Sequence, residues 1–409
     1  MTSDPDRLAF ERLCGSDPFL TDIRPAGEVV PGFEPNLILA SGVPLPWERY
    51  VGGQREAILG AAQFEGLAAS REEADALLAA GEIRVAPCHH HGCVGSVAGV
   101  YTASMPVFVV ENRPFGNVGF CNFYEGNEPR RLNYGCYDDA VRDQLHYVHE
   151  QVAPVVADAV RRSGGIALKP IMRRALNLGD ELHSRNTAAT MLFERALLPA
   201  LLDIAAEDRR RVDATVEMLA SSDYFFLRLS MAASKAIADG AHGIAGSGVV
   251  TALVIGCEGF AIRVSGLGDH WFTGPHADVE AKLFEGHTVD EIAWMGGESC
   301  ITETIGLGGF AQAAAPALQS YQGGSAQAML DRNLAMYDIV VGENETFRLP
   351  WLDYRGTPTG IDVRKVVRTG ILPVIDAGIG GRDGGQIGAG VVRAPIECFE
   401  AAAAALDPA

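Results

Sequence analysis

The chain has 409 residues and a formal net charge of −19, with 48% hydrophobic and 21% charged residues. This length exceeds one ordinary hydrophobic core and the apolar content argues against disorder, so two or three globular domains are expected. The acidity argues against nucleic-acid binding, which needs a basic face, and is typical of a soluble cytoplasmic protein.

No targeting, membrane or disulfide signal stands out. Residues 1–7 are acidic and lack the basic and apolar regions of a signal peptide. The uncharged stretch 304–330 is interrupted by glutamines, by Pro316 and by paired glycines, so it is not expected to span a membrane. The eight cysteines include no CxxC pair, which favours reduced thiols over disulfides or a zinc knuckle.

The first part of the chain mixes strand and helix signals. Short apolar, β-branched runs at 37–40 and 106–110 predict buried strands. Residues 56–78 are rich in Ala, Leu and Glu and predict a helix. Apolar side chains at three- and four-residue steps over 141–155 predict another helix, which Pro154 must kink or split.

The rest of the chain divides into a helical part and a glycine-rich part. Residues 166–239 are helical in pattern, and clustered glycines follow at 240–248. Beyond them, 249–255 and 260–264 predict strands and 310–318 predicts an Ala-rich helix. We therefore predict a multi-domain α+β (mixed α/β) fold with an α/β domain at 1–165, a small all-helical domain at 166–242 and a Gly-rich α+β domain at 243–409.

Three adjacent histidines, His89, His90 and His91, are the first candidate site. Imidazole can exchange a proton near neutral pH and is the commonest metal ligand in proteins. Three neighbouring rings cannot all face a core, so at least one is expected to point to a cleft or to solvent. A solvated loop with one histidine capping a strand end is the alternative.

The second candidate is Glu111-Asn112-Arg113, directly after the predicted strand at 106–110. The end of a buried strand is where α/β scaffolds present their sites. The Glu111 carboxylate could act as a base and the Asn112 amide could bind a carbonyl group. The Arg113 guanidinium could donate two hydrogen bonds to a carboxylate or phosphate. A simple salt bridge at the strand end explains the same residues equally well.

The third candidate is the block Gly-Asp-Glu-Leu-His-Ser-Arg-Asn at 179–186. In helical geometry Asp180, His183 and Asn186 share a face, so the carboxylate can orient the imidazole. Glu181 and Arg185 then fall on another face as a surface ion pair. A divalent metal on Asp180 and His183 is one alternative, and a helix-capping Asp180 beside a half-buried histidine is another.

The fourth candidate is the segment 355–365, which has basic residues at both ends and is expected to form a loop leading into a helix. Its glycines and hydroxyls suit an anion cradle, although the spacing of a Walker loop is absent. Glu303 lies in a neutral neighbourhood, where a raised pKa, an ammonium-binding role or a buried structural role all fit. Ser-His-Asp chemistry is disfavoured because no GxSxG elbow occurs.

Long motifs give the chain a family resemblance. The stretches APCHHHGCVGSVAGVYTASMPVFVVEN, GDELHSRN, ITETIGLGGF, RGTPTGIDVRK and GQIGAG are similar to those of a bacterial family long described as uncharacterised. One member class of that family is a component of oxamate carbamoyltransferase. The resemblance extends from about residue 22 to the C-terminus and thus covers nearly the whole chain.

The resemblance implies carbamoyl exchange between oxalurate and phosphate, giving oxamate and carbamoyl phosphate in allantoin breakdown. It also implies companion subunits, one of them similar to acyl-CoA synthetases, and a homo-oligomer is expected. A metal-dependent amidohydrolase acting on a ureido or cyclic amide compound is one alternative, with His89, His91 and His183 as candidate ligands of a divalent metal. A non-catalytic subunit that binds a metabolite or its partners is another.

Carbamoyl transfer needs a proton shuttle, donors for an oxyanion and cationic holders for carboxylate and phosphate. On the matching motifs, His90 or His91 would shuttle the proton, with Glu111 or the Asp180–His183 pair as second base. Asn112 and Arg113 would polarise the carbonyl group. The other candidate substrate-binding residues are Arg185, Asn186, Glu303, Arg355, Thr357, Thr359, Asp362, Arg364 and Lys365. These segments would have to converge on one cavity.

Overall fold

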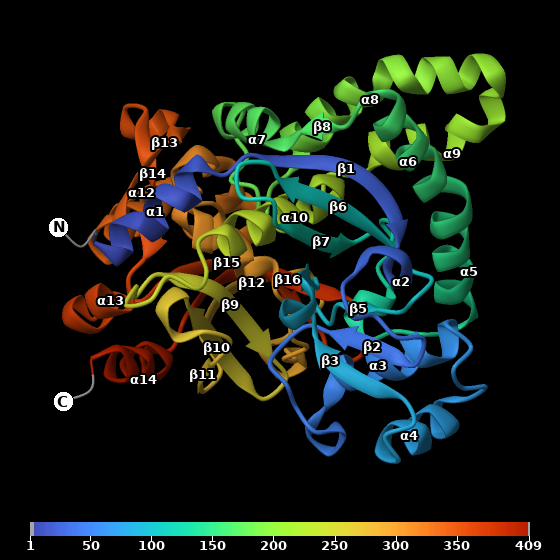
Figure 1. The fold of residues 1–409 in the computed structure, drawn as a ribbon, viewed down its shortest axis with the longest axis horizontal. Coiled ribbons are helices and arrows are strands. Elements are labelled where there is room, and N and C mark those ends of the chain that lie inside the picture. The colour runs from blue at the N-terminus through green and yellow to red at the C-terminus, as the bar shows by residue number, and fades with distance from the viewer. Residues whose placement is uncertain (1–3, 408–409) are drawn as a thin grey trace.

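The computed structural model describes residues 4–407 and shows several small sheets with helices packed around them (Figure 1). The fold is α+β, as the sequence predicts. Its largest sheet contains five strands, and only the β4–β7 pair in it is parallel. In spatial order the strands are β4 (Cys93–Val94), β7 (Val118–Asn122), β6 (Pro106–Asn112), β1 (Pro18–Pro25) and β8 (Ile166–Ala167).

Four smaller sheets complete the β-structure. Two lie before and after the helical part of the chain, in the orders β3 (Arg84–Pro87), β2 (Leu37–Ala40), β5 (Val100–Tyr101) and β11 (Trp271–Gly274), β10 (Gly259–Val264), β9 (Val250–Gly256). The other two are β12 (Asp278–Leu283), β16 (Gln386–Arg393), β15 (Val374–Gly380) and the hairpin β13 (Val340–Leu349), β14 (Arg355–Ile361). All of these pairs are antiparallel except β2–β3.

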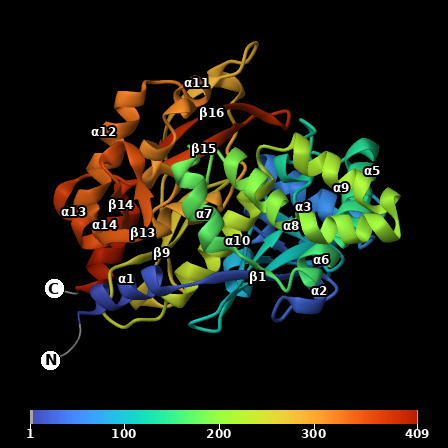
Figure 2. The same cartoon turned by 90° about the horizontal axis from the view of Figure 1, so that it is seen from above.

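Helices surround these sheets on several sides. In the first half they are α1 (Pro5–Gly15), α2 (Ala26–Val29), α3 (Gly52–Phe64), α4 (Arg71–Ala79), α5 (Asp139–Tyr147), α6 (Ala153–Arg162) and α7 (Leu168–Asn177). In the second half they are α8 (Thr187–Glu207), α9 (Arg209–Ser221), α10 (Phe225–Gly240), α11 (Gln319–Gln322), α12 (Ala326–Met336), α13 (Val363–Thr369) and α14 (Ile396–Leu406). In both views α8 and α9 lie at the opposite end of the molecule from α13 and α14 (Figures 1 and 2).

Helix α10 lies at the centre because it is buried almost all round. Its sequence, FFLRLSMAASKAIADG, packs against β6 and β7 of the largest sheet and against the turn Ser299–Ile305. The largest core cluster draws on all three predicted segments, from Ala9 to Leu349, with Phe225 among its wholly buried side chains. The division of the chain into domains at 165 and 242 stays a prediction.

Several local predictions are confirmed. The strands expected at 37–40, 106–110, 249–255 and 260–264 form β2, β6, β9 and β10. The helix expected over 56–78 forms as two helices, α3 and α4. The helix expected over 141–155 passes through a π-helical turn at Val148–Val152, and Pro154 is the second residue of α6, within the first turn, where a missing backbone N–H costs least.

Three local predictions are wrong. Residues 310–318 form short 3₁₀ turns instead of a helix, because Asn333 binds both Phe310 O (2.9 Å) and Ala313 N (2.9 Å) and overrides the helical preference of the alanines. Residues 355–361 are not a loop, because they pair with β13 as strand β14. The block 180–186 is not helical, because its backbone is bound by a side chain described below.

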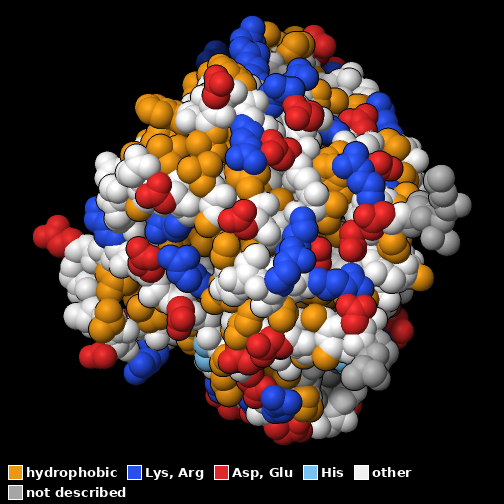
Figure 3. Space-filling model, turned by 90° about the vertical axis from the view of Figure 1, so that its left-hand side faces the viewer, with side chains coloured by type: hydrophobic (Ala, Val, Ile, Leu, Met, Phe, Trp, Pro, Cys, Tyr) orange, Lys and Arg blue, Asp and Glu red, His pale blue; other side chains and the backbone are white. Residues whose placement is uncertain are grey.

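The described residues add two facts about the molecule as a whole. No helix among residues 4–407 is long and apolar enough to cross a membrane. Figure 3 shows one side of the molecule, where acidic and basic side chains lie interspersed. That face has no extended basic area of the kind that nucleic acid requires.

Candidate active site

A small polar cavity lies where α10, the 180–186 loop and the turn Ser299–Ile305 come together. Its volume is about 70 Å³, well below that of pockets for drug-sized ligands, so only a small molecule could enter it. We call it the His183 cavity. Its lining residues are Ser96, Val97, Tyr124, Arg131, Asn133, Tyr134, His183, Ser184, Tyr224, Leu227, Arg228, Ser299, Tyr321, Gly378 and Gln386.

The loop that presents His183 is organised by the wholly buried carboxylate of Glu181. This carboxylate accepts hydrogen bonds from the backbone N–H groups of His183 (3.1 Å), Ser184 and Arg185 (3.0 Å). A side chain that binds the backbone in this way competes with helix formation. Leu182 takes a left-handed φ of 73° at the same place, which turns the chain away from a helix.

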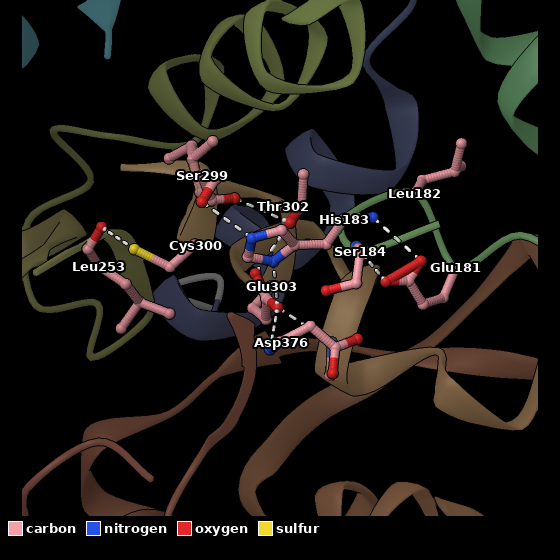
Figure 4. A network of polar contacts seen from close by, with 12 residues as sticks. Glu181, Leu182, His183, Ser184, Leu253, Ser299, Cys300, Thr302, Glu303 and Asp376 are labelled. Atoms are coloured by element: carbon pink, nitrogen blue, oxygen red, sulfur yellow. Dashed lines mark hydrogen bonds and ion pairs between the residues drawn. The ribbon is translucent and has the colours of Figure 1, made fainter. Parts of the chain in front are cut away.

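The imidazole of His183 bridges a hydroxyl and a carboxylate. Its Nε2 lies 2.8 Å from Ser299 Oγ, and its Nδ1 lies 2.8 Å from Glu303 Oε1 (Figure 4). The same Glu303 oxygen accepts the backbone N–H groups of Gly309 and Asp376, both at 3.0 Å. Because Glu303 Oε1 accepts the Nδ1 proton, Nε2 of the neutral ring is left facing the Ser299 hydroxyl.

The Ser299–His183–Glu303 chain differs from what the sequence predicts. The missing GxSxG elbow argues against a serine relay, yet Ser299 stands at the start of a 3₁₀ turn with its hydroxyl on the imidazole. Asp180 was the expected partner of His183, but its Oδ2 accepts the N–H of Ala189 (2.8 Å) and caps α8. Such chains occur on unrelated folds and are recognised by geometry rather than by motif.

Carboxylates around His183 determine its proton affinity. Burial on its own lowers the pKa of His183, but the charge of Glu303 and its hydrogen bond outweigh burial, so the pKa is raised above its ordinary value. The side chain of His183 is 5% exposed and that of Glu303 is fully buried, so water screens this pair only weakly. The ring is thus a strong proton acceptor.

A pair of buried carboxyl groups, Glu181 and Asp376, lies beside this chain (Figure 4). Burial raises the pKa of both groups, and each also feels a neighbouring negative charge. Asp376 Oδ1 accepts the side-chain amides of Gln312 (2.5 Å) and Gln322 (3.0 Å), whereas no hydrogen-bond donor among residues 4–407 reaches its buried Oδ2. The pair therefore favours a shared proton over two negative charges.

Two guanidinium groups supply positive charge to the cavity. Arg228, from α10, is 3% exposed, and within residues 4–407 it makes no ion pair and its Nη1 has no partner. Its Nη2 lies 3.2 Å from Asn133 when the Asn133 amide is oriented to donate to Glu125. Arg131 donates to Gly126 O (2.8 Å) and leaves Nε without a partner. Burial raises the pKa of the nearby Glu125 carboxyl, and the charges of Arg228 and Arg131 act against that rise. Two cations beside one buried carboxyl leave positive charge in the cavity, which suits an anionic ligand.

A second small cavity, of about 50 Å³, lies on the other side of the same residues. It shares Val97, His183, Ser299 and Gly378 with the first cavity, and its remaining wall is largely apolar. Ser299 is only partly buried and borders both spaces. Its hydroxyl is therefore accessible to a small ligand from two sides.

The three adjacent histidines point in different directions. His89 is buried and its Nδ1 lies 3.1 Å from the Nζ of buried Lys235. His90 accepts the indole N–H of Trp271 (3.1 Å) at the edge of a hollow of about 470 Å³. His91 Nδ1 lies 2.8 Å from Pro31 O. None of the three lines the His183 cavity.

The structure also places the residues at 111–113 away from that cavity. Glu111 is exposed at the end of β6, and Arg113 is exposed with its guanidinium 3.3 Å from the centre of the Phe19 ring. Asn112 is buried and donates to Ser16 Oγ (3.0 Å) and to Ala236 O (3.1 Å), which ties the strand end to α10. These contacts account for Asn112 and Arg113 without a ligand, and Glu111 faces solvent.

The remaining candidates near His183 support its loop. Asn186 is buried and its Nδ2 donates to His183 O (2.8 Å). Arg185 lies with Nε 3.6 Å from Asp180 Oδ1, so its carboxylate neighbour is Asp180 and not Glu181. Burial raises the pKa of Asp180 to about 6. Of the sequence candidates only His183 lines the cavity, with Glu303 directly behind it.

The segment 355–365 has partners of its own. Arg355 pairs with Glu343 (2.7 Å) and lies over the Tyr337 ring, while Arg364 pairs with Asp407 (2.7 Å).

The other polar residues of this segment also have hydrogen-bond partners within the protein. Thr357 and Thr359 are buried with their hydroxyls 3.4 Å apart, Asp362 caps α13 through Arg364 N (2.9 Å), and Lys365 donates to Val340 O (2.5 Å). None of them lines the His183 cavity.

The described residues offer no metal centre. Among residues 4–407, no group of three or more His, Cys, Asp or Glu side chains is arranged to hold a metal ion. The candidate ligands His89, His91 and His183 bind Lys235, Pro31 and Glu303 instead. The donor set therefore does not fit the divalent metal that the sequence leaves open.

Sequence reasoning missed Ser299, Glu181, Asp376 and the two arginines. Arg228 left a signal, since it is a charged residue inside the apolar helix sequence FFLRLSMAA. Ser299 precedes Glu303 by four residues, but only the 3₁₀ turn places both on one imidazole. Asp376 carries no local signal, because its role depends on contacts with residues far away in the chain.

Fold and site together define an α+β protein built around a small, polar, buried cavity with groups suited to proton transfer and to holding an anion. Residues 83–299 match the model of the family described as oxamate carbamoyltransferase subunit AllG. The chain is 37% identical to the oxamate carbamoyltransferase subunit AllG of Escherichia coli (strain K12), over 97% of this chain and 96% of that protein. The chain belongs to this family, as its motifs predict.

Two further proteins are similar over nearly the whole chain. The uncharacterized protein YahG of Escherichia coli (strain K12) is 42% identical over 97% of this chain and 84% of its own length. The crystal structure of a conserved protein of unknown function from Enterococcus faecalis V583 matches with a TM-score of 0.94 and 38% identity, covering 98% of this chain and 96% of that one. The fold is therefore shared with that protein.

Proposed function

We propose that this chain is the catalytic component of a carbamoyltransferase, exchanging a carbamoyl group between a small ureido acid such as oxalurate and phosphate. The observation that carries the proposal is the meeting of a proton-accepting imidazole, His183, with the buried guanidinium of Arg228 in one small cavity, where Nη1 of Arg228 has no hydrogen-bond partner among residues 4–407. The name of the family supplies the reaction class, and the cavity supplies groups that the reaction needs.

Each group has a defined task in this reaction. Arg228 and Arg131 hold the carboxylate of the ureido acid, since guanidinium and carboxylate form charge-assisted hydrogen bonds. Fixing the carboxylate places the carbamoyl carbon next to His183. His183 takes up a proton as the carbamoyl group is attacked and returns it to the departing amide nitrogen. Glu303 stabilises the imidazolium in between.

Companion subunits are part of the proposal. The chain's relative is named as a subunit, so we propose that the complete enzyme contains further chains, one of them similar to acyl-CoA synthetases, alongside copies of this one. The experiment below is therefore performed with the chain alone and with its companions. No step of the proposed reaction passes through a metal ion.

The test compares Arg228→Met with Arg173→Met, an exposed arginine on α7. Oxamate and carbamoyl phosphate are measured with oxalurate and phosphate as substrates. Arg228→Met is expected to raise KM for the ureido acid about 10- to 100-fold through the lost charged hydrogen bonds, while Arg173→Met has no effect. Arg228→Met also removes a positive charge near buried Glu125, so thermal unfolding of both variants is measured to separate a folding defect from lost substrate binding.

Three other outcomes would contradict the proposal. Equal cleavage of the ureido acid with and without phosphate would indicate a hydrolase. Full activity of an Arg228→Met complex would indicate that this chain only supports its partners. Failure of the wild-type chain to produce carbamoyl phosphate under any of these conditions would refute the reaction itself.

A further inference from the structure

Ser299 has the contacts of a nucleophile as well as those of a structural hydroxyl. Its Oγ lies 2.8 Å from His183 Nε2, and the opposite ring nitrogen lies 2.8 Å from Glu303 Oε1 (Figure 4). A hydroxyl is a weak nucleophile until a neighbouring base accepts its proton, and a carboxylate behind the base strengthens it. The three side chains provide this arrangement without any rearrangement.

Hydrogen bonds to Glu303 hold the Ser299–His183–Glu303 chain, which we call the His183 relay, in a fixed position. Glu303 Oε1 accepts the N–H groups of Gly309 and Asp376 (3.0 Å each), and Oε2 accepts the hydroxyl of Thr302 (2.8 Å). The carboxylate therefore cannot rotate freely, and the imidazole keeps its tautomer and its direction. On the other side, Ser299 borders both small cavities and is only partly buried, so the reacting atom is accessible to a ligand.

We propose that Ser299 is a catalytic residue that carries the carbamoyl group between the two substrates, so that transfer occurs in two half-reactions. The inference rests on the function proposed above and goes further, because it names the nucleophile and excludes direct attack by phosphate on the ureido acid. It also gives a use to both cavities, since Ser299 can receive the group from one and release it towards the other.

The first half-reaction forms a carbamoyl ester. Ser299 Oγ bonds to the carbamoyl carbon while His183 Nε2 takes the hydroxyl proton. The bond between that carbon and the amide nitrogen then breaks, and His183 returns the proton to the nitrogen. The products are oxamate and a carbamoyl group on Ser299.

The second half-reaction restores the serine. An oxygen of hydrogen phosphate bonds to the carbamoyl carbon, and His183 takes the phosphate proton. The carbon–Oγ bond breaks, and the same proton passes to Oγ. Carbamoyl phosphate leaves and Ser299 is free again. No oxidant, metal or further reactant is needed, and every proton is returned by the same ring.

The experiment first uses wild-type protein, with companion subunits if activity requires them, and oxalurate without phosphate. We expect about one equivalent of oxamate to be released rapidly, as is typical of an accumulating covalent intermediate. Labelled oxamate should exchange into oxalurate without phosphate, which requires a reversible first half-reaction. Peptide mass mapping should locate one added carbamoyl group on Ser299, and added phosphate should remove it as carbamoyl phosphate.

Two variants complete the test. Ser299→Ala should lose the adduct and the exchange, and turnover should fall about 10³-fold or more, as for other serine relays. Ser163→Ala is the control, because that hydroxyl bonds only to Ala159 O at the end of α6. Thermal unfolding verifies that both variants fold. The exchange measurement uses wild-type protein, so its result holds even if a variant fails to fold.

The two proposals fail in distinguishable ways. Phosphate-dependent turnover without exchange or adduct, together with a Ser299→Ala rate above about a tenth of wild type, would overturn the covalent route and leave carbamoyl transfer intact. If wild-type protein with its companions forms no carbamoyl phosphate, the proposed function fails and this inference fails with it.

Discussion

At the scale of single residues, the Glu303 carboxylate controls the pKa of His183. Glu303 raises the pKa of His183 against the opposing effect of burial. A raised pKa means that the folded protein holds this proton more tightly than the unfolded chain does. This contribution to stability is therefore complete at acid pH and is lost as pH rises through the raised value. Because the pKa is raised, the ring also becomes neutral only at a higher pH, and the proposed mechanism needs the neutral ring.

Glu303→Gln should make this effect visible. Without the negative charge, burial is left to lower the pKa of His183, so the acid limb of the kcat/KM profile should move to lower pH. The plateau should fall about 10²- to 10⁴-fold, because the imidazolium loses its stabilising partner. The pH dependence of kcat/KM, measured from pH 5 to 9, tests both statements. An unchanged acid limb would show that another group titrates there.

At the scale of elements, the turn 306–309 packs directly against Glu303 and His183. A Cβ on Gly308 would lie 2.2 Å from Glu303 Oε1 and 3.0 Å from His183 Cβ, and the residue has a φ of +56°. The glycine is thus needed both for its backbone conformation and for the close approach of the Glu303 and His183 side chains. This explains why glycines stand at 306, 308 and 309, a few residues after Glu303.

Gly308→Ala should therefore damage both stability and activity. We expect a loss of about 1–3 kcal/mol of unfolding free energy and at least a tenfold loss of kcat/KM, because the relay must shift. Gly66→Ala is the matched control, with a φ of +74° and no atom near the added Cβ. It should cost about 1 kcal/mol and no activity. Denaturant unfolding and steady-state kinetics measure the two effects, and equal behaviour of the variants would contradict the packing argument.

The sequence predicted elements better than it predicted the site. Apolar runs located β2 and β6 because burial of β-branched residues is a local signal. The sequence singled out His183 and Glu303 separately, but nothing local shows that residues 120 positions apart share a hydrogen bond. The loop at 180–186 was predicted as helix because the spacing suits one, whereas the buried Glu181 binds its backbone instead.

At the scale of the whole molecule, both ends of the chain are fastened to the same helix. Arg364, on α13, contacts Asp6 near the N-terminus (3.4 Å) and Asp407 near the C-terminus (2.7 Å). The labels for the two termini lie near α13 and α14 in Figure 1, in agreement with these contacts. The segment 355–365, predicted to be an anion cradle, thus has an observed role in joining distant parts of the chain.

Arg364→Ala should have a small effect that is confined to stability. The ion pairs are partly exposed, so we expect a loss of about 0–1 kcal/mol of unfolding free energy, smaller still at high salt. The kinetic constants should stay at wild-type values, because Arg364 does not line the His183 cavity. Unfolding at low and high salt and a KM measurement for phosphate test this. A raised KM would restore the anion-binding hypothesis for this segment.

The raised pKa values of Glu181 and Asp376 have a consequence for the medium in which the protein works. An arriving carboxylate or phosphate adds negative charge beside this pair and so strengthens its hold on the proton. Ligand and hydrogen ion then assist each other's binding to an equal degree. For the reaction proposed above, saturation with an anionic substrate would then depend on the acidity of the surroundings, even though the balanced reaction consumes no hydrogen ion.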